Sequence, residues 1–526
     1  MAGKAKSRGP LIMASLLLAA FLVNLDTTIV NVALPSLVRQ LHASNTQLQW
    51  VVDAFSLLFA GSVLAFGSLS DRFGRKGMLL AGLAVFGLAS LVGGLMPSAG
   101  ALIGARAVMG VGAAMVFPAT LSVLTNVFTS RNERALAIGL WGAVTGMAIA
   151  LGPIVGGALL EVFDWRSIFF AMVPVAGAAA LAVGRYAPTS RDPLAPRLDV
   201  PGFALSTAMV TLLVFTIIEA PTHGWGSART LISFAMATLL AVGFASWEAR
   251  AEQPMLDVRL FSNMRFTAAS MSVAISFFAL SGFIFLVVQY FQFLKGWGPL
   301  ATGVRLLPVA TFVAISSVLG SKLAVKVGTK LIVGLGMLLT AGFYFWVTDT
   351  GNGTDYVEIA AQMIVLGTGM GLTSAPATEA IMGVVPKAKA GVGSAMNDAT
   401  RLLGATLGVA IIGSVYTSLY SARLTTNLGG VMPGSALDAA RSSVGEALGA
   451  ATKIASGHPQ VLQTLRGGVS DAFFHGFHAG DLVSGAVALV GALLAFVFLP
   501  AHPVTTDFDA SAVASLDKET PVPAIP

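Results

Sequence analysis

Residues 67–76 read GSLSDRFGRK, and this short polar stretch separates two apolar runs near 48–70 and 77–96. Four of its ten residues are charged, whereas Asp53 is the only charged residue in the two runs. Each run has the roughly 20 residues that a helix needs to cross a hydrocarbon core of about 30 Å. The stretch therefore predicts a polar turn between two membrane-spanning helices.

The rest of the chain repeats this pattern. The 526 residues are 55% hydrophobic and 11% charged, whereas soluble proteins carry about 25% charged residues, which excludes a soluble fold. The high glycine content, 58 residues, is typical of helices that pack closely in lipid. About 14 spanning segments are expected, near 11–33, 48–70, 77–96, 101–123, 134–160, 168–185, 201–219, 230–247, 266–292, 301–323, 330–347, 357–385, 394–417 and 474–499.

Charge and cysteine content exclude other classes. The net charge of +6 lies in short basic clusters between apolar runs, which argues against a nucleic-acid partner. The chain has no cysteine and hence no disulfide or thiolate chemistry. With both termini in the cytoplasm, roughly 20 Lys and Arg lie inside against about 9 outside, as the positive-inside rule requires. We expect a multi-pass inner-membrane protein with both termini cytoplasmic.

The spacing of the segments predicts two six-helix halves. Residues 321–330, SKLAVKVGTK, repeat the basic-x-Gly-x-basic spacing of 72–76 around Gly328. The segment 418–473 is mostly polar, and it holds either a short surface helix or a loosely folded loop. The expected organisation is a cytoplasmic N-terminus at 1–10, a six-helix bundle at 11–185, a Pro-rich linker at 186–200, two extra helices at 201–248, a second six-helix bundle at 249–500 that includes the external loop 418–473, and a disordered tail at 501–526.

Three charged residues inside spanning segments are candidates for function. A carboxylate in a spanning helix costs roughly 2.5–3.5 kcal/mol on insertion scales, so Asp26 is a functional candidate by default. Counted from the helix ends, Asp26, Arg106 and Asp53 lie at about one depth, which suggests a carboxylate–guanidinium cluster. Two alternatives stay open: Asp26 only forms hydrogen bonds between helices, and Asp53, nearest the interface, is solvated.

Two motifs identify a family. GSLSDRFGRK resembles motif A of the major facilitator superfamily, G-x-x-x-D-R-x-G-R-K, whose positions are Gly67, Asp71, Arg72, Gly74, Arg75 and Lys76. An ordinary positive-inside loop would explain the basic residues but not the whole pattern. LDTTIVNVALP at 25–35 resembles the first-helix motif of the 14-helix drug:proton antiporter family, in which the carboxylate corresponds to Asp26. Arg106 corresponds to the buried Arg of the family's motif B, which is linked to proton transfer.

The fifth segment resembles motif C, the antiporter signature of the same family. The matching positions are Gly142, Gly146, Gly152, Pro153, Gly156 and Gly157. Ala148 stands where the motif has Gly, but Ala is still small enough for close packing. The resemblance implies export and a seal against leakage, whereas generic packing of small residues is the alternative.

Three residues in the last half lie near the cytoplasmic edge. Asp398 and Arg401 are spaced i, i+3 on one helical face and can pair, and Glu379 lies at a similar depth. Two interpretations are open: the three residues gate the cytoplasmic side of the transporter or bind cations, or Asp398 and Arg401 form an ion pair that is only structural.

The resemblance implies an all-α major facilitator fold with two additional helices. It also implies a proton-coupled antiporter that exports lipophilic, often cationic, small molecules. No G-x-x-x-x-G-K-[ST] motif is present, so a proton gradient rather than ATP is the expected energy source, without a cofactor or metal. We expect a monomer in the lipid bilayer. An exporter of an endogenous lipid, peptide or siderophore stays open, whereas a membrane enzyme would need a catalytic constellation that the sequence lacks.

Overall fold

The computed structural model describes residues 9–128, 131–190, 199–251, 258–384, 390–456 and 458–499. Within these ranges the chain is helical and contains no strand. The predicted N-terminus up to residue 8, most of the linker (191–198) and the tail from 500 lie outside the described residues.

Each of the 14 predicted segments is a helix. The first half holds α2 (Gly9–Leu41), α3 (Asn45–Phe73), α4 (Arg75–Leu95), α5 (Ala99–Val127), α6 (Arg131–Val162) and α7 (Arg166–Tyr186). The two extra helices are α8 (Val200–His223) and α9 (Ala228–Glu248). The second half holds α10 (Met264–Gln289), α12 (Leu307–Val327), α13 (Thr329–Val347), α14 (Tyr356–Val384), α15 (Ala390–Leu428) and α18 (Pro459–Phe498). Short helices complete it: η1 (Val258–Ser262), η2 (Tyr290–Leu294), α11 (Pro299–Arg305), α16 (Gly434–Ser442) and α17 (Val444–Ile454).

Helix length and hydropathy agree with a membrane location. Thirteen helical stretches within the described residues are long and apolar enough to span a bilayer. The remaining predicted segment is α3, where Asp53 is the only charged residue between Trp50 and Gly67. The expectation of an all-α membrane protein with two six-helix bundles and two extra helices is confirmed.

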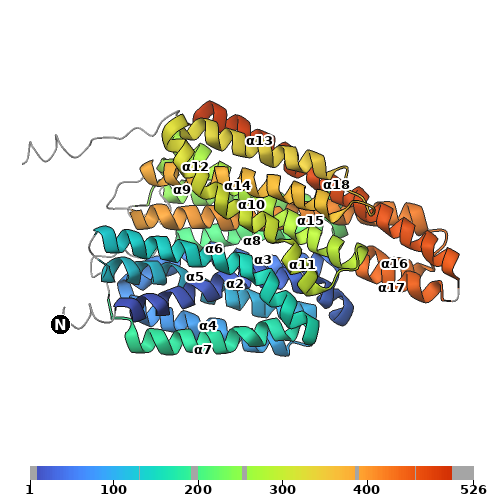
Figure 1. Cartoon of the computed structure of the whole chain (residues 1–526), viewed down its shortest axis with the longest axis horizontal. Helices are drawn as coiled ribbons and strands as arrows, with labels where there is room; N and C mark the ends of the chain where they lie inside the picture. The colour runs from blue at the N-terminus through green and yellow to red at the C-terminus, as the bar shows by residue number, and fades with distance from the viewer. Residues whose placement is uncertain are drawn as a thin grey trace, which may run out of the picture.

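The bundle has two distinct ends. The N-terminus of α2 and the C-terminal end of α18 lie at one end, which we call the terminal end, and α16 and α17 cap the other, which we call the loop end (Figure 1). Helices α15 and α18 continue past their predicted spans into 418–473 because apolar side chains there, such as Leu424 and Leu465, are buried. The polar composition of this segment gave no indication that α15 and α18 pack there.

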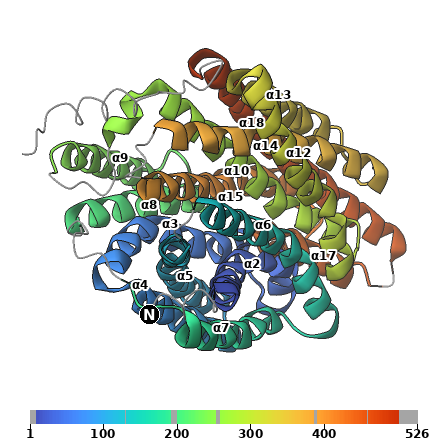
Figure 2. The same cartoon turned by 60° about the vertical axis from the view of Figure 1, so that its left-hand side comes forward.

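The two extra helices lie beside the seam between the halves. Figure 2 shows α8 next to α3 of the first half and α15 of the second. The Ser414 hydroxyl on α15 donates to the Ile217 carbonyl on α8 at 2.8 Å, and Thr207 on α8 donates to the Gly61 carbonyl on α3 at 3.4 Å. Helix α8 is therefore bonded to both halves.

The sequence repeat corresponds to a repeated turn. Gly74 joins α3 to α4 with φ of 119°, and Gly328 joins α12 to α13 with φ of 105°. Side-chain-bearing residues rarely adopt such φ values, so glycine at both positions allows the next helix to start without a loop.

Candidate functional site

A buried ion pair joins two helices of the first half. The Arg106 guanidinium on α5 donates from Nη1 to Asp26 Oδ2 on α2 at 2.5 Å. The two side chains are 1% and 2% exposed. A charge-assisted bond in a site without water is strong, and removal of one partner from a buried pair typically costs about 3–5 kcal/mol. This pair is the centre of the candidate site.

Helix α3 holds the guanidinium in place. Arg106 Nε donates to the Val51 carbonyl at 3.0 Å, and the guanidinium carbon lies 4.5 Å from the centroid of the Phe55 ring. Gly110, one turn after Arg106, packs directly against the Phe55 carbonyl, where a Cβ would collide with backbone. The glycine thus lets α5 approach α3 closely enough for Arg106 to contact it.

Asp53 lies apart from this pair. Its side chain is fully buried, and neither carboxylate oxygen has a hydrogen-bond partner within the described residues. Gln49, one turn earlier on the same face of α3, donates to the Val409 and Ala410 carbonyls of α15. Asp53 therefore lies on the face of α3 directed to the second half. The structure brings Asp26 and Arg106 together, and it buries Asp53 instead of solvating it.

The predicted charged turn connects to α7. Lys76 donates from Nζ to the Gly184 carbonyl at 2.8 Å, and the Arg75 backbone N–H donates to the Ser190 carbonyl at 3.0 Å. Arg72 is exposed and lies over the Phe73 ring, and Gly67 is in ordinary contact with Pro118 of α5. The Asp71 side chain lies outside the described residues. These bonds hold the turn to its own half.

The small residues of α6 face two different helices. Gly152 packs on Thr28 and Gly156 on Ile29, both on α2. Thr28 also donates to the Ile149 carbonyl at 3.0 Å. A Cβ added to Gly146 would meet nothing within 4 Å, and the side-chain surroundings of position 142 lie outside the described residues.

The next residues of α6 contact the second half. A Cβ on Gly157 would lie 2.6 Å from Leu300 Cα of α11, and the Pro153 carbonyl packs directly on Gly303 of α11. The Leu300 N–H donates to Glu161 Oε1 at 3.2 Å. The glycine-rich face predicted for packing thus forms a backbone-to-backbone contact between the halves.

Other bonds join the halves at the same end. Gln292 of η2 donates from Nε2 to the Val32 carbonyl of α2 at 2.9 Å. His42, just after α2, lies 2.6 Å from Glu446 of α17. Together with the α6–α11 contact, these bonds close the loop end between the two halves.

The predicted residues of the last half lie toward the terminal end. Arg401 and Asp398 pair at 3.7 Å, and the Arg401 guanidinium lies 4.5 Å from the Phe277 ring centroid. Glu379 on α14 is exposed and interacts electrostatically with Arg265 of α10. Pairing of Asp398 with Arg401 agrees with both the gating and the structural interpretation, and Glu379 has a different partner.

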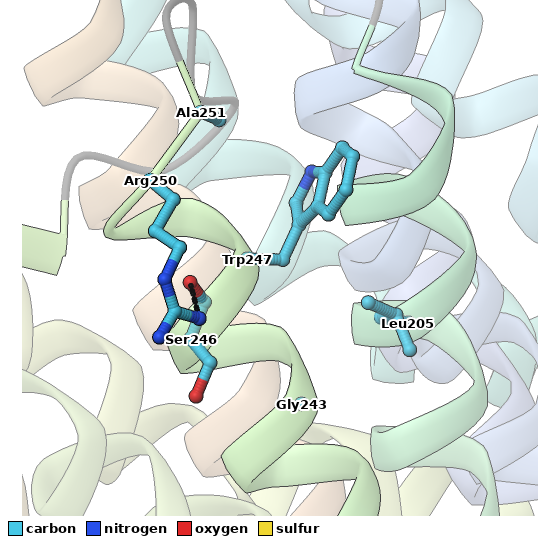
Figure 3. Close-up of a pocket in the computed structure, with 6 residues that line it drawn as sticks. All are labelled: Leu205, Gly243, Ser246, Trp247, Arg250 and Ala251. Carbon is cyan, nitrogen blue, oxygen red and sulfur yellow. Dashed lines mark hydrogen bonds between the residues drawn. The ribbon is translucent and has the colours of Figure 1, made fainter.

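A surface cavity lies between the two extra helices. It has a volume of about 280 Å³ and is lined by Leu205, Gly243, Ser246, Trp247, Arg250 and Ala251 (Figure 3). Arg250 donates to the Ser246 carbonyl at 3.3 Å, and the Trp247 indole donates to Asp199 at 2.8 Å. None of its lining residues belongs to the Asp26–Arg106 site. Nor do any three His, Asp or Glu side chains in the described ranges come together as a metal site would require.

The sequence reasoning missed two buried carboxyls, Glu248 at the end of α9 and Asp481. Asp481 on α18 is 3% exposed and lies inside the last predicted span. A carboxyl within an apolar spanning segment was the available signal, the same one that identified Asp26.

Comparisons with known proteins agree with this architecture. The family model of the Major Facilitator Superfamily matches residues 16–409. The multidrug efflux pump LfrA of Mycolicibacterium smegmatis is 34% identical over 91% of this chain and 95% of its own. The methyl viologen resistance protein SmvA of Salmonella typhimurium is 32% identical over 81% of this chain and 86% of its own.

A solved structure shares the fold. A bacterial homologue of the human lysosomal transporter Spinster, in an inward-facing and occupied conformation, superposes with a TM-score of 0.66 at 16% identity. The match covers 92% of this chain and 96% of that one. Helix plan, family match and relatives agree that the chain is a multi-pass membrane transporter of the Major Facilitator Superfamily.

Proposed function

We propose that the protein is a proton-coupled antiporter that exports lipophilic, often cationic, small molecules. The observation that carries the proposal is the buried Asp26–Arg106 pair, a titratable carboxylate inside the bundle with one cationic partner. Relatives named for multidrug efflux and for resistance to methyl viologen support the substrate class. These names do not identify individual substrates. Pockets lined mainly by apolar side chains discriminate weakly between lipophilic molecules.

The pair offers a way to couple a proton to a conformational change. A proton on Asp26 removes its charge and weakens its bond to Arg106, because a neutral carboxyl attracts a guanidinium less strongly. Arg106 is bonded to α3 as well as α2, so loss of the pair loosens the contact between these helices. A cationic substrate and a proton would then compete for the same negative charge.

The membrane potential supplies enough energy for this exchange. Moving one elementary charge through 100 mV is worth about 2.3 kcal/mol, so one or two protons per cycle sustain a useful substrate gradient. We infer that this gradient is the energy source and that the transporter needs no cofactor and works as a monomer.

We place the terminal end in the cytoplasm and the loop end outside. Arg72, Arg75 and Lys76 lie at the terminal end, where the positive-inside rule puts them next to the cytoplasm of an inner membrane. Because the halves are joined at the loop end, we infer that the outer side is closed in this conformation. The α6–α11 contact would then seal the outer side against proton leakage, and the Asp398–Arg401 pair and Glu379 would lie along the inner entrance.

Everted membrane vesicles test the central role of Asp26. With ethidium as the lipophilic cation, Asp26→Asn should abolish pH-gradient-driven uptake, because an amide cannot bind and release the proton. Asp164→Asn is a matched control, because Asp164 is an exposed carboxylate paired with Arg166 at the loop end. Proton-driven ethidium uptake that persists in the Asp26→Asn vesicles at the wild-type rate would show the proposal to be wrong.

A further inference from the structure

Asp481 is a further buried carboxyl in a spanning helix, and like Asp53 but unlike Asp26 it has no ion-pair partner within the described residues. Its Oδ2 atom is buried without a hydrogen-bond partner within the described residues. The residue lies on α18, which packs against α10, α13 and α15 inside the second half (Figure 1).

The groups around Asp481 are neutral. Tyr344 of α13 interacts with it electrostatically, and the Tyr344 hydroxyl donates to the Ala279 carbonyl of α10. On α18 itself, the Ser484 hydroxyl donates to the Gly480 carbonyl at 3.0 Å. At the neighbouring Gly480, α15 contributes Ile412 and α10 contributes Leu286. The Lys and Arg residues of the packed helices lie toward their ends, at Arg265, Lys330, Arg401, Arg423 and Arg466.

This setting favours the neutral acid. A buried carboxylate without a cation or a hydrogen-bond donor is less stable ionised than protonated. Asp481 thus lacks the kind of partner that Arg106 provides for Asp26.

Two histidines precede Asp481 on α18, toward the loop end. His475, His478 and Asp481 are spaced i, i+3 and i+6 on α18, a rise of about 4.5 Å for each step. His475 is exposed, His478 is half-buried and Asp481 is buried, so the three groups lead from the surface of the protein into the bundle. His475 and His478 are close enough to interact electrostatically, and Asp349 also acts on His478.

A backbone bond defines the tautomer of the middle histidine. His478 Nε2 lies 2.8 Å from the Thr350 carbonyl oxygen, which can only accept. Nε2 therefore carries the hydrogen, and the neutral ring leaves Nδ1 as a proton acceptor. To pass a proton on, the ring must accept at Nδ1, break its Nε2 bond to Thr350 and turn Nε2–H toward the next group.

We propose that Asp481 binds a second proton of the transport cycle, delivered from the loop end through His475 and His478. His475 takes a proton and passes it to His478, which then passes it to the Asp481 carboxylate. Each imidazolium returns to the neutral ring when it gives up the proton. The proposal rests on the proton-coupled export proposed above, and it assigns a proton site to the second half of the molecule.

Purified protein in proteoliposomes tests this site with ethidium as substrate. In Asp481→Asn, the number of protons exchanged for each ethidium should fall by one. The largest ethidium gradient sustained at 100 mV should then fall about 50-fold, the equivalent of one charge. Ser484→Ala, one turn away on α18, is the matched control and should keep the wild-type proton count. An unchanged count in Asp481→Asn overturns the proposal.

Infrared difference spectroscopy on the same protein separates this inference from the general one. The wild type should show the carbonyl band of a protonated carboxyl that is lost in Asp481→Asn and responds to pH. A band that never responds to pH would mark a purely structural acid and overturn the second site. If ethidium transport by the wild type is not proton-coupled, the proposed antiport is wrong. The pH response of the carboxyl band still decides whether Asp481 titrates.

Variants of the two histidines test the proton relay separately, and they can be measured even if Asp481→Asn does not fold. Replacing both relay histidines, His475→Gln with His478→Gln, should slow the pH response of the Asp481 band severalfold, and added imidazole should restore it. His458→Gln, an exposed histidine at the start of α18, is the matched control. Wild-type response rates in the double variant would exclude the relay.

Discussion

The two halves of the molecule share a helix plan, and the buried carboxyls in their spanning helices have two kinds of surroundings: Asp26 has a cation, whereas Asp53 and Asp481 have none within the described residues. In the first half Asp26 is paired with Arg106, which a third helix holds through the Val51 carbonyl. In the second half Asp481 is surrounded by tyrosine, serine and apolar groups. A paired carboxylate links helices and depends on its partner, whereas an unpaired one is stable only as the neutral acid. The comparison shows how one fold can bury both paired and unpaired carboxyls.

The largest effect is expected when Arg106, the cation paired with Asp26, is removed. Arg106→Met leaves the Asp26 carboxylate buried without a partner and should lower the free energy of unfolding by about 3–5 kcal/mol. Asp481→Asn, which loses no ionic partner, should change it far less. Thermal unfolding of the purified variants measures both, and Asp26→Asn combined with Arg106→Met should recover part of the loss. Equal losses for Arg106→Met and Asp481→Asn would contradict the distinction.

The contact between the halves offers a second test. Gly157→Ala places a methyl group 2.6 Å from the Leu300 backbone, and overpacking of this kind typically costs about 1–3 kcal/mol. The closed loop end should become less populated, since the clash exists only while the halves touch. Gly146→Ala is the control from the same motif, because its methyl group meets nothing within 4 Å.

Spin-label distances measure this opening. The chain has no cysteine, so Asp164→Cys and Asp355→Cys place labels on the two halves at the loop end without other changes. Gly157→Ala should broaden the distance distribution toward longer values, and Gly146→Ala should leave it unchanged. Identical distributions for the two variants would mean that the α6–α11 contact does not hold the loop end closed.

The smallest effect is expected at the repeated turns. Gly74→Ala and Gly328→Ala each force a side-chain-bearing residue into positive φ and should lower the free energy of unfolding by about 1 kcal/mol. The two losses should be similar because the turns have similar geometry. Ethidium export should fall further in Gly74→Ala, where the turn carries Arg72, Arg75 and Lys76. Thermal unfolding and vesicle uptake measure the two effects, and a neutral Gly328→Ala would contradict the equivalence of the turns.

Much of the site follows from distances along single helices. Asp26 and Arg106 could be matched in depth because each residue of a helix adds about 1.5 Å, so counting from the helix ends places both in one layer. Which way a side chain points around its helix depends on packing. The same counting therefore grouped Asp53 with the pair, although its face of α3 is directed to α15. For the same reason motif C predicted close packing of α6 but not that Gly157 meets α11.

The sequence by itself determined the membrane location, the number and order of the spans and the family, because hydropathy and short motifs are properties of contiguous residues. It also contained the GSLSDRFGRK turn, whose counterpart at Gly328 revealed the two halves. Only the tertiary structure decided which charges meet: Arg106 reaches Asp26, while Asp53 and Asp481 have no cation within the described residues. It also decided that the halves are joined at the loop end. These outcomes depend on helix rotation and on contacts between residues far apart in the chain, where the free energy of burying or pairing a charge selects one arrangement.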